Sequence, residues 1–251
     1  MAKKTYLTFL YHEATDNVAN TGFQRNSNLP YKHKLKEFYD NIDIIFENCS
    51  NIITINDLKS SSNGTLLTFD DGGKSAMIIA DYLEKYNLKG HFFITTSMIG
   101  KKCFLNQKDI IELHDRGHII GSHSHSHPNI FKSLTYNQMI CEWLESKKIL
   151  ENILNTKVQS CSVPGGDANT DTYLSAQECG FNIVFNSEPT IKLIEKENLK
   201  VFGRFCPKSG TNYSIIKNLC HHKGLKTQLF IRKMKNLIRT LFFPIYSKVY
   251  N

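Results

Sequence analysis

Short apolar runs alternate with helix-period stretches along most of this 251-residue chain, and this alternation constrains its fold most strongly. The runs, interpreted as strands, lie near residues 6–12, 51–55, 65–69, 90–95, 118–122, 158–163, 181–186 and 200–205. The helix-period stretches lie near residues 73–86, 107–115, 135–154 and 170–179. Strands that alternate with helices favour a parallel α/β sheet, and the length suits one domain of barrel size.

Two adjacent carboxylates end one of these runs. Asp70 and Asp71 come directly after the apolar run 65–69 and are followed by Gly72. Successive side chains of a strand point to opposite faces, but a turn at the strand end can aim both acids at one cleft. A cation bound to Asp71 would keep that acid ionised, while Asp70 would stay free to accept a proton. The alternative is an ordinary Asp-Asp-Gly turn without chemistry.

Three imidazoles at alternate positions follow the strand-like run 118–122. Two of them, His123 and His127, are spaced so that a helical turn or a tight loop can bring both to one face for zinc-type ligation. Metal ligation needs neutral imidazoles steadied by neighbouring acceptors, and Ser124 is expected to help hold the loop. The alternative is an exposed His-rich tract with only adventitious metal affinity.

A glycine pair follows the strand-like run 158–163 and precedes a helical stretch. Gly165 and Gly166, after Pro164, leave backbone N–H groups unobstructed, as an oxyanion pocket requires. Without the other two segments, a plain strand-to-helix turn would explain this one.

In their order and spacing, the three segments resemble the motifs of the polysaccharide deacetylases of the NodB type, carbohydrate esterase family 4. Thr68–Gly72 is similar to the first motif in full, His123-Ser124-x-x-His127 to the second, and Pro164–Gly166 to the core of the third. The similarity runs from about residue 6 to residue 205. Three motifs in register are far more specific than one, which argues against the turn and His-tract alternatives.

The resemblance implies an α/β fold of a particular kind, a distorted (β/α) barrel of the NodB-homology type. It also implies a divalent ion, usually Zn²⁺, held by Asp71, His123 and His127, with Asp70 as the catalytic base. The chemistry is sensible, since three protein ligands leave a position for water and the ion lowers that water's pKa.

The oxyanion and substrate side of the site departs from the family pattern. The resemblance implies that Pro164 and Gly165 line this pocket, where the Gly165 N–H would stabilise a tetrahedral oxyanion. The family usually has an arginine two residues before the proline, where this chain has Ser162. Arg204 resembles the family's late proline-arginine segment and is expected to supply the missing charge; the alternative is a surface arginine. The fourth-motif tryptophan is absent, and Trp143 is interpreted as core packing.

Two histidines are candidates for the general acid. His221 matches the family's late Leu-x-His letters, but it follows a helix-like segment, 214–218. His12 ends the first strand-like run, and the carboxyl ends of barrel strands face the active site. A Tyr-His pair here is also similar to the branch of the family that modifies exopolysaccharides. His12 is therefore preferred, with a non-catalytic strand-end histidine as the alternative.

Positive charge is concentrated near the end of the chain. Residues 198–251 hold 11 Lys/Arg and no acidic residue, whereas residues 1–197 hold 20 against 23. Apolar residues recur there at helical spacing, with basic residues between them: Phe230, Met234, Leu237, Ile238, Leu241 and Phe242. This pattern predicts a basic amphipathic C-terminal helix, suited either to peripheral contact with an anionic membrane or to packing on the barrel. No nucleic-acid motif is present, and no nucleic-acid partner is expected.

The compartment is predicted from cysteines and the start of the chain. The seven cysteines are odd in number and form no Cys-x-x-Cys pair, which favours reduced thiols. The first residues lack the long apolar centre of a signal peptide. We therefore expect a cytoplasmic location, with a peripheral position at the inner face of the membrane as its extension.

Together these observations predict a barrel domain over residues 1–222 and a basic tail over residues 223–251. The predicted function is metal-dependent removal of an acyl group, most often N-acetyl, from an amino sugar of a polysaccharide, oligosaccharide or lipid-linked glycan. Its expected partners are an N-acetylated glycan or glycolipid. One alternative is a catalytically inactive, carbohydrate-binding protein of the same fold, and another is a membrane-associated interaction protein.

Overall fold

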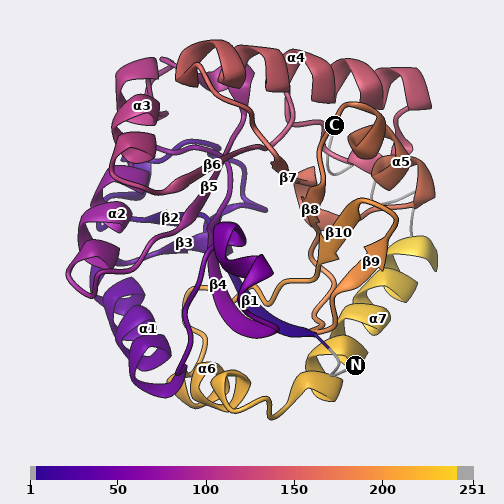
Figure 1. Ribbon diagram of the computed structural model, residues 1–251. Helices are drawn as coiled ribbons and strands as arrows, with labels where there is room; N and C mark the ends of the chain where they lie inside the picture. Colours follow the sequence, from indigo (N-terminus) through magenta and orange to yellow (C-terminus); the bar gives the residue numbers. More distant parts are fainter. Residues whose placement is uncertain (1–3, 242–251) are drawn as a thin grey trace.

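The computed structural model describes residues 4–241, and within this range eight strands form one curled sheet (Figure 1). The strand order is β1-β4-β5-β6-β7-β8-β10-β9, and all neighbours are parallel except β10 and β9. These strands are β1 (Thr5–Tyr11), β4 (Asn63–Phe69), β5 (His91–Ile94), β6 (Ile119–Ser122), β7 (Ser160–Ser162), β8 (Ile183–Phe185), β9 (Ile194–Lys196) and β10 (Leu199–Phe202). The predicted parallel α/β fold is confirmed.

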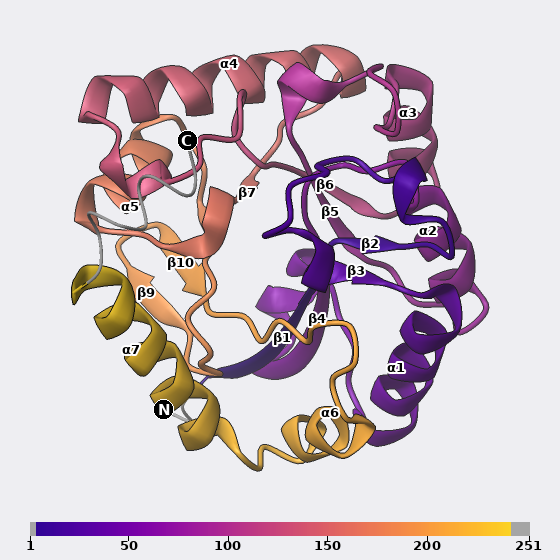
Figure 2. The same cartoon turned by 180° about the vertical axis from the view of Figure 1, so that it is seen from behind.

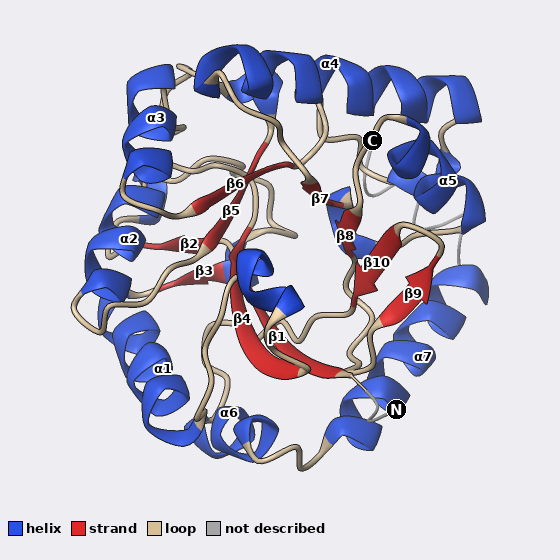
Figure 3. Ribbon diagram, viewed as in Figure 1, coloured by secondary structure: helices blue, strands red, loops and turns tan. Residues whose placement is uncertain are grey.

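Helices surround the curled sheet and cover its outer face (Figure 3). They are α1 (Leu35–Asn48), α2 (Ala76–Glu84), α3 (Gln107–Asp115), α4 (Tyr136–Leu154), α5 (Thr170–Glu178), α6 (Tyr213–Cys220) and α7 (Leu225–Leu241). A small parallel pair, β2 (Glu13–Ala14) and β3 (Lys32–His33), lies apart from the main sheet. The helices after β4, β6 and β7 provide the crossovers that parallel strands require.

The sheet closes into a distorted barrel where β1 meets the segment after β10. Leu10 donates its backbone N–H to the carbonyl of Phe205 at 2.8 Å, and the Phe205 N–H bonds to the carbonyl of Thr8 at 2.8 Å. Because this contact is a short bridge instead of a full strand pair, the barrel is irregular on this side. The carboxyl ends of β1, β4 and β10 are thereby brought close together.

Aromatic side chains fill the space between the sheet and the helices. Phe69 stacks on Phe92 with ring centroids 4.9 Å apart, and both are fully buried. Trp143 of α4 is fully buried against Phe131 and Phe181, with centroid distances of 4.5 and 5.7 Å. The interpretation of Trp143 as core packing is confirmed, and such burial explains why α4 lies firmly on the sheet.

Two parts of the sequence prediction for secondary structure are wrong. No strand forms at residues 51–55, where only Ile52 makes an isolated bridge to Thr65. Thr54 and Asp57 instead form a capping box that begins a 3₁₀ helix at Ile55. Helix α1 and the short strand β9 were not predicted, although α1 buries an amphipathic face.

The predicted C-terminal helix is present as α7, and the expected helix at residues 214–218 is present within α6. Seen from the front and from behind, α7 lies outside the β9–β10 hairpin (Figure 2). Phe242 and the rest of the predicted tail beyond Leu241 lie outside the described residues. Across residues 4–241, no helix has the length and apolar character needed to cross a membrane.

Candidate active site

The chemically active side chains gather where the parallel strands end. His12 follows β1, Asp70 and Asp71 follow β4, His123 follows β6, and Arg204 comes two residues after β10. The carboxyl ends of parallel strands share one edge of the sheet, so residues distant in sequence meet there.

Asp71 is turned into the site by its backbone. Its φ angle is +79°, a conformation rare for residues other than glycine. This turn directly after β4 lets two successive acids approach the same imidazole: Asp71 Oδ1 lies 3.4 Å from His123 Nε2, and Asp70 Oδ2 lies 3.8 Å from it. The turn expected from the sequence is therefore present, and it brings both acids to one imidazole.

The two predicted histidine ligands converge on the same carboxylate oxygen. His127 Nε2 lies 3.5 Å from Asp71 Oδ1, and Nδ1 of His123 donates to the backbone carbonyl of Ser162 at 2.9 Å. That hydrogen bond fixes the His123 tautomer and leaves its Nε2 directed at the acids. Ser124 accepts a hydrogen bond from the His127 N–H at 3.1 Å, which confirms the expected role of this serine in the loop.

Glu142 of α4 holds the loop between the two histidines. Its carboxylate accepts hydrogen bonds from the backbone N–H groups of His125 and Ser126, at 2.9 and 2.7 Å, and from the Ser126 hydroxyl at 2.5 Å. The middle imidazole, His125, bonds through Nδ1 to the Thr96 hydroxyl at 3.0 Å and does not join the cluster. The sequence alone gave no reason to connect Glu142 with the histidine segment, because the contact depends on how α4 packs.

Asp70 is clamped by an arginine and a serine. Arg204 Nη1 and Nη2 donate to the two Asp70 oxygens at 2.8 Å each, and Arg204 Nη2 also donates to the Ser162 hydroxyl at 2.8 Å. That hydroxyl in turn donates to Asp70 Oδ2 at 2.9 Å. Arg204 is only 1% exposed, which rules out the surface-arginine alternative. Arg204 thus places a buried positive charge beside Asp70, as expected from the sequence, and the Ser162 hydroxyl adds a second donor.

His12 lies beside the same group of charges. Its Nδ1 is buried and has no hydrogen-bond partner among residues 4–241, and its ring packs on Tyr31 at a centroid distance of 5.0 Å. Burial lowers the pKa of His12, although the nearby carboxylates of Asp71 and Asp70 act in the opposite direction. The other candidate acid, His221, is exposed at the end of α6.

The buried charges shift the titration of the whole cluster. Burial would raise the pKa of Asp71, but the hydrogen bond with His123 and the charges of His12 and His127 hold it well below its usual range. Burial also opposes ionisation of Asp70, yet the Arg204 guanidinium and His123 lower its pKa. Because their pKa values are lowered, Asp70 and Asp71 are both ionised near pH 7. Burial lowers the pKa of His127 to about 4, so this imidazole is neutral near pH 7.

His123 behaves differently from His127. Burial acts to lower its pKa, but the carboxylates of Asp70 and Asp71 outweigh that effect and raise it. A cation bound at His123 would take the place of a proton on this imidazole, because ligation requires the neutral form.

The donor set fits a tetrahedrally coordinated cation. Donor atoms of Asp71, His123 and His127 all lie within 4.8 Å of one another, the metal-type cluster found in residues 4–241. Two ligands that are each about 2.0–2.2 Å from a tetrahedral ion lie about 3.3–3.6 Å apart. The distances of 3.4 and 3.5 Å from Asp71 Oδ1 to the imidazole nitrogens match that spacing. Two nitrogens and one oxygen form a donor set typical of zinc and other transition metals.

The Pro-Gly-Gly segment forms a 3₁₀ turn, Pro164–Gly166, after β7. Pro164 is buried, whereas Gly165 is exposed and adopts φ +67°. A Cβ on Gly166 would lie 1.9 Å from the Ser187 hydroxyl oxygen, so only glycine fits there. The predicted role of Pro164 and Gly165 in the oxyanion and substrate pocket stays a prediction.

A loop over residues 15–31 adds aromatic side chains that the sequence prediction missed. Phe23 lies against the His127 ring at a centroid distance of 4.7 Å, as Tyr31 does against His12. The buried ion pair between Glu13 and Lys32, 3.2 Å long, ties the two ends of this loop together.

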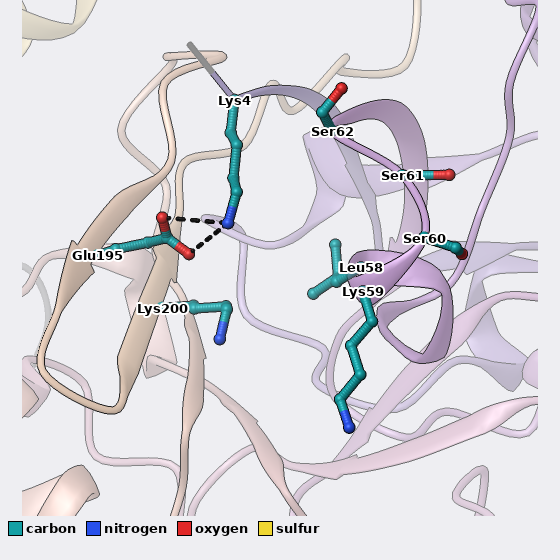
Figure 4. A pocket seen from close by; sticks show the side chains of 8 residues that line it. All are labelled: Lys4, Leu58, Lys59, Ser60, Ser61, Ser62, Glu195 and Lys200. Carbon is teal, nitrogen blue, oxygen red and sulfur yellow. Dashed lines mark hydrogen bonds and ion pairs between the residues drawn. The ribbon is translucent and has the colours of Figure 1, made fainter. Parts of the chain in front are cut away.

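A separate pocket of about 420 Å³ lies at the opposite ends of the strands (Figure 4). Its lining comprises Lys4, Leu58, Lys59, Ser60, Ser61, Ser62, Glu195 and Lys200. Lys4 and Glu195 form an ion pair of 3.0 Å across it. Because Lys4 precedes β1 and Ser62 precedes β4, this pocket lies at the amino ends of these strands, away from the histidine cluster.

Comparison with known proteins shows which family the chain resembles. The family model described as polysaccharide deacetylase matches residues 58–184, about half of the chain. YxkH of Bacillus subtilis, which is named as a polysaccharide deacetylase, is 30% identical over 141 residues, 56% of this chain and 50% of YxkH. The peptidoglycan-N-acetylglucosamine deacetylase PgdA of Listeria monocytogenes is 37% identical over 79 residues, 30% of this chain and 16% of PgdA. The chain thus spans half the length of YxkH and less of PgdA.

Solved structures share the fold. The deacetylase PplD of Streptococcus pyogenes superposes with a TM-score of 0.72 at 16% identity, covering 87% of this chain and 98% of PplD. IcaB of Ammonifex degensii superposes with a TM-score of 0.70 at 16% identity, covering 87% and 96%. The family match includes both the acidic and the histidine segments, and family members are hydrolases of amide bonds that generally depend on a divalent metal. The chain therefore belongs to the polysaccharide deacetylase family.

Proposed function

We propose that this chain removes acetyl groups from N-acetylated amino sugars of a glycan, with a divalent cation, most commonly Zn²⁺, in the cluster at the carboxyl ends of the strands. The observation that carries the proposal is the spacing of the Asp71, His123 and His127 donor atoms beside a second, separately clamped carboxylate, Asp70. A site built only for stability would have no need of two adjacent buried acids directed at one imidazole.

The residues of the chain divide the work between holding a cation and moving protons. Asp71, His123 and His127 would hold the cation, which supplies a Lewis acid and lowers the pKa of water. Asp70 is positioned to accept a proton, and Arg204 and Ser162 keep its carboxylate in one orientation.

The proposed reaction requires two further groups, a proton donor to the leaving amine and a hydrogen-bond donor to the oxyanion. His12 is the proposed donor because it lies within the influence of both acids and its Nδ1 has no partner among the described residues. The N–H of Gly165, the exposed residue of the Pro164–Gly166 turn, is the proposed donor to the developing oxyanion.

The names of relatives support an N-acetylglucosamine unit as the first substrate to test. PgdA of Listeria monocytogenes and a protein of Bacillus cereus are both named as peptidoglycan-N-acetylglucosamine deacetylases. A lipid-linked glycan is the finer proposal. The seven free cysteines support work in a reducing, cytoplasm-like compartment, at the inner face of the membrane.

Acetate release tests this proposal. The full chain, incubated with chitooligosaccharides and with glycan from its own cells, should release acetate in the presence of Zn²⁺. Activity should disappear with a chelator and return when Zn²⁺ is added, while Asp70→Asn stays inactive throughout. If the chelator left acetate release unchanged, the proposed metal dependence would be rejected. A cation bound at the cluster, with no acetate released from either substrate, would instead indicate an inactive binding protein.

A further inference from the structure

Helix α7 presents an apolar face away from the barrel. Leu225, Leu229 and Arg232 are half-buried on the side that faces the protein. Phe230, Met234 and Leu237 are exposed, at 64%, 41% and 51%. At about 100° per residue, these three exposed side chains share the opposite side of the helix.

The charges on α7 are of one sign. Its sequence, residues 225–241, contains five Lys/Arg and no acidic residue. Lys226 and Lys233 are exposed and fall along one edge of the apolar face. Of the nearby acids, Asp167 and Glu188 pair with Arg232 on the inner side of the helix. The outer side is therefore apolar with a positive border.

Arg232 fixes this helix to the edge of the sheet that carries the site. It contacts Asp167, directly after the Pro164–Gly166 turn, and Glu188, after β8, at 3.6 Å. Both partners follow the carboxyl ends of strands, as the metal-type cluster does. A surface that binds the outer side of α7 would thus lie beside the active-site edge.

We infer that α7 docks the protein on an anionic lipid bilayer, with Phe230, Met234 and Leu237 in the boundary between headgroups and acyl chains. Charge complementarity selects this occupant: lysines beside an apolar face suit anionic headgroups. If a second copy of the chain bound there, two α7 helices whose charged residues are all basic would meet, and the repulsion between like charges opposes this. Resting on the proposed function, the inference adds that the substrate is a glycan held at that surface.

Vesicle co-sedimentation of the full chain tests the docking. Vesicles of phosphatidylcholine containing phosphatidylglycerol should bind wild type about tenfold or more tightly than vesicles of phosphatidylcholine alone. The double variant Phe230→Asp with Leu237→Asp should lose about tenfold or more of the binding to anionic vesicles. Leu144→Asp with Leu174→Asp is the matched control, because these leucines of α4 and α5 are 50% and 49% exposed. That control should bind as wild type does.

Three outcomes would overturn the inference. These are equal binding to neutral and anionic vesicles, unchanged binding of the Phe230/Leu237 variant, and a concentration-dependent dimer that this variant abolishes while vesicle binding stays absent. Acetate release from soluble chitooligosaccharides is measured in parallel and should be the same in wild type and in both double variants. Vesicle binding without acetate release would reject the proposed function and leave the docking intact.

Discussion

Arg204 and Asp70, 134 positions apart in the chain, form a buried bidentate ion pair with both N–O distances at 2.8 Å. The pair joins the end of β4 to the segment after β10 and shares the Ser162 hydroxyl. Two parallel hydrogen bonds fix the orientation of the carboxylate as well as its charge. The ion pair therefore both stabilises the closure of the barrel and orients Asp70, the proposed base.

Replacing the arginine should destabilise the protein strongly. Arg204→Ala leaves the Asp70 carboxylate buried without its partner, and we expect the free energy of unfolding to fall by about 3–5 kcal/mol in urea denaturation. Arg116→Ala is the control, since its ion pairs with Asp81 and Glu84 are partly exposed to solvent and should contribute about 1 kcal/mol or less. Adding Asp70→Asn to Arg204→Ala should recover part of the loss. Equal effects of the two arginine variants would contradict the assigned importance of the buried pair.

The two adjacent acids should separate metal binding from rate. Asp70→Asn should keep metal content near wild type while acetate release falls by about 10²-fold or more, because Asp70 is the proposed proton acceptor and is not one of the three converging donors. His127→Ala should lose the metal, whereas His125→Ala should retain it because His125 bonds to Thr96. Metal content by atomic emission, alongside rate, checks all three variants. Equal metal loss in Asp70→Asn and His127→Ala would reverse the roles of the aspartates.

The Glu142 clamp should affect metal affinity without touching the metal. Glu142→Gln keeps the shape of the side chain but removes the charge that accepts two backbone N–H groups and the Ser126 hydroxyl. We expect zinc affinity to fall by about 10–100-fold, as for other groups that orient ligands. Competition with a chromophoric chelator measures it. Glu145→Gln, an exposed change on the same helix, is the control, and an effect as large there would argue for a general loss of charge.

How much of the site could be predicted from sequence depends on how local each contact is. Asp70 and Asp71 are neighbours, and His123 and His127 share one loop, so residue types and spacing made them candidates. The resemblance to three family motifs then argued against an ordinary turn and an exposed His-rich tract. The bond from Arg204 to Asp70 depends on barrel closure, and the sequence left a surface arginine as an equal alternative. The bonds of Glu142 to the histidine loop cross between elements and left no signal in the sequence.

The fold shows the same division. The buried strands of the parallel sheet were predicted because their apolar runs are continuous, and Trp143 was correctly assigned to the core. The run at residues 51–55 has strand-like composition, but the local hydrogen bonds of Thr54 and Asp57 favour a 3₁₀ turn over sheet pairing. Helix α1 was missed although Phe38, Ile42 and Ile45 recur at helical spacing and form its buried face.

His12 should affect rate alone. His12→Gln preserves a polar side chain of similar length but cannot donate the proton proposed for the leaving amine, so acetate release should fall by about 10²-fold. Metal content should stay at the wild-type level, because His12 is not among the three converging donors. His221→Gln, at an exposed helix end, is the matched comparison. A normal rate in His12→Gln with a reduced rate in His221→Gln would transfer the acid to His221.

Acid should weaken the barrel through a histidine outside the site. His91 is fully buried, its Nδ1 donates to the carbonyl of Leu67 at 2.8 Å, and its Nε2 accepts from the Ile55 N–H at 3.0 Å. A second proton on Nε2 would break the latter bond. Burial lowers the pKa of His91 to about 4, and burial likewise lowers the pKa of His118 to about 4.

The folded state therefore binds fewer protons than the unfolded chain between these values and the ordinary histidine pKa of about 6.5. The stability due to His91 is fully present above about pH 6.5 and is lost as the pH falls towards about 4, a change of about 3 kcal/mol at most. In His91→Gln, the free energy of unfolding should decrease less as the pH falls. The part of the decrease that is due to His118 should remain. Urea denaturation of metal-free protein at several pH values measures the slope, with His114→Gln, an exposed histidine, as the control. Parallel pH profiles for wild type and His91→Gln would show that His91 does not govern acid stability.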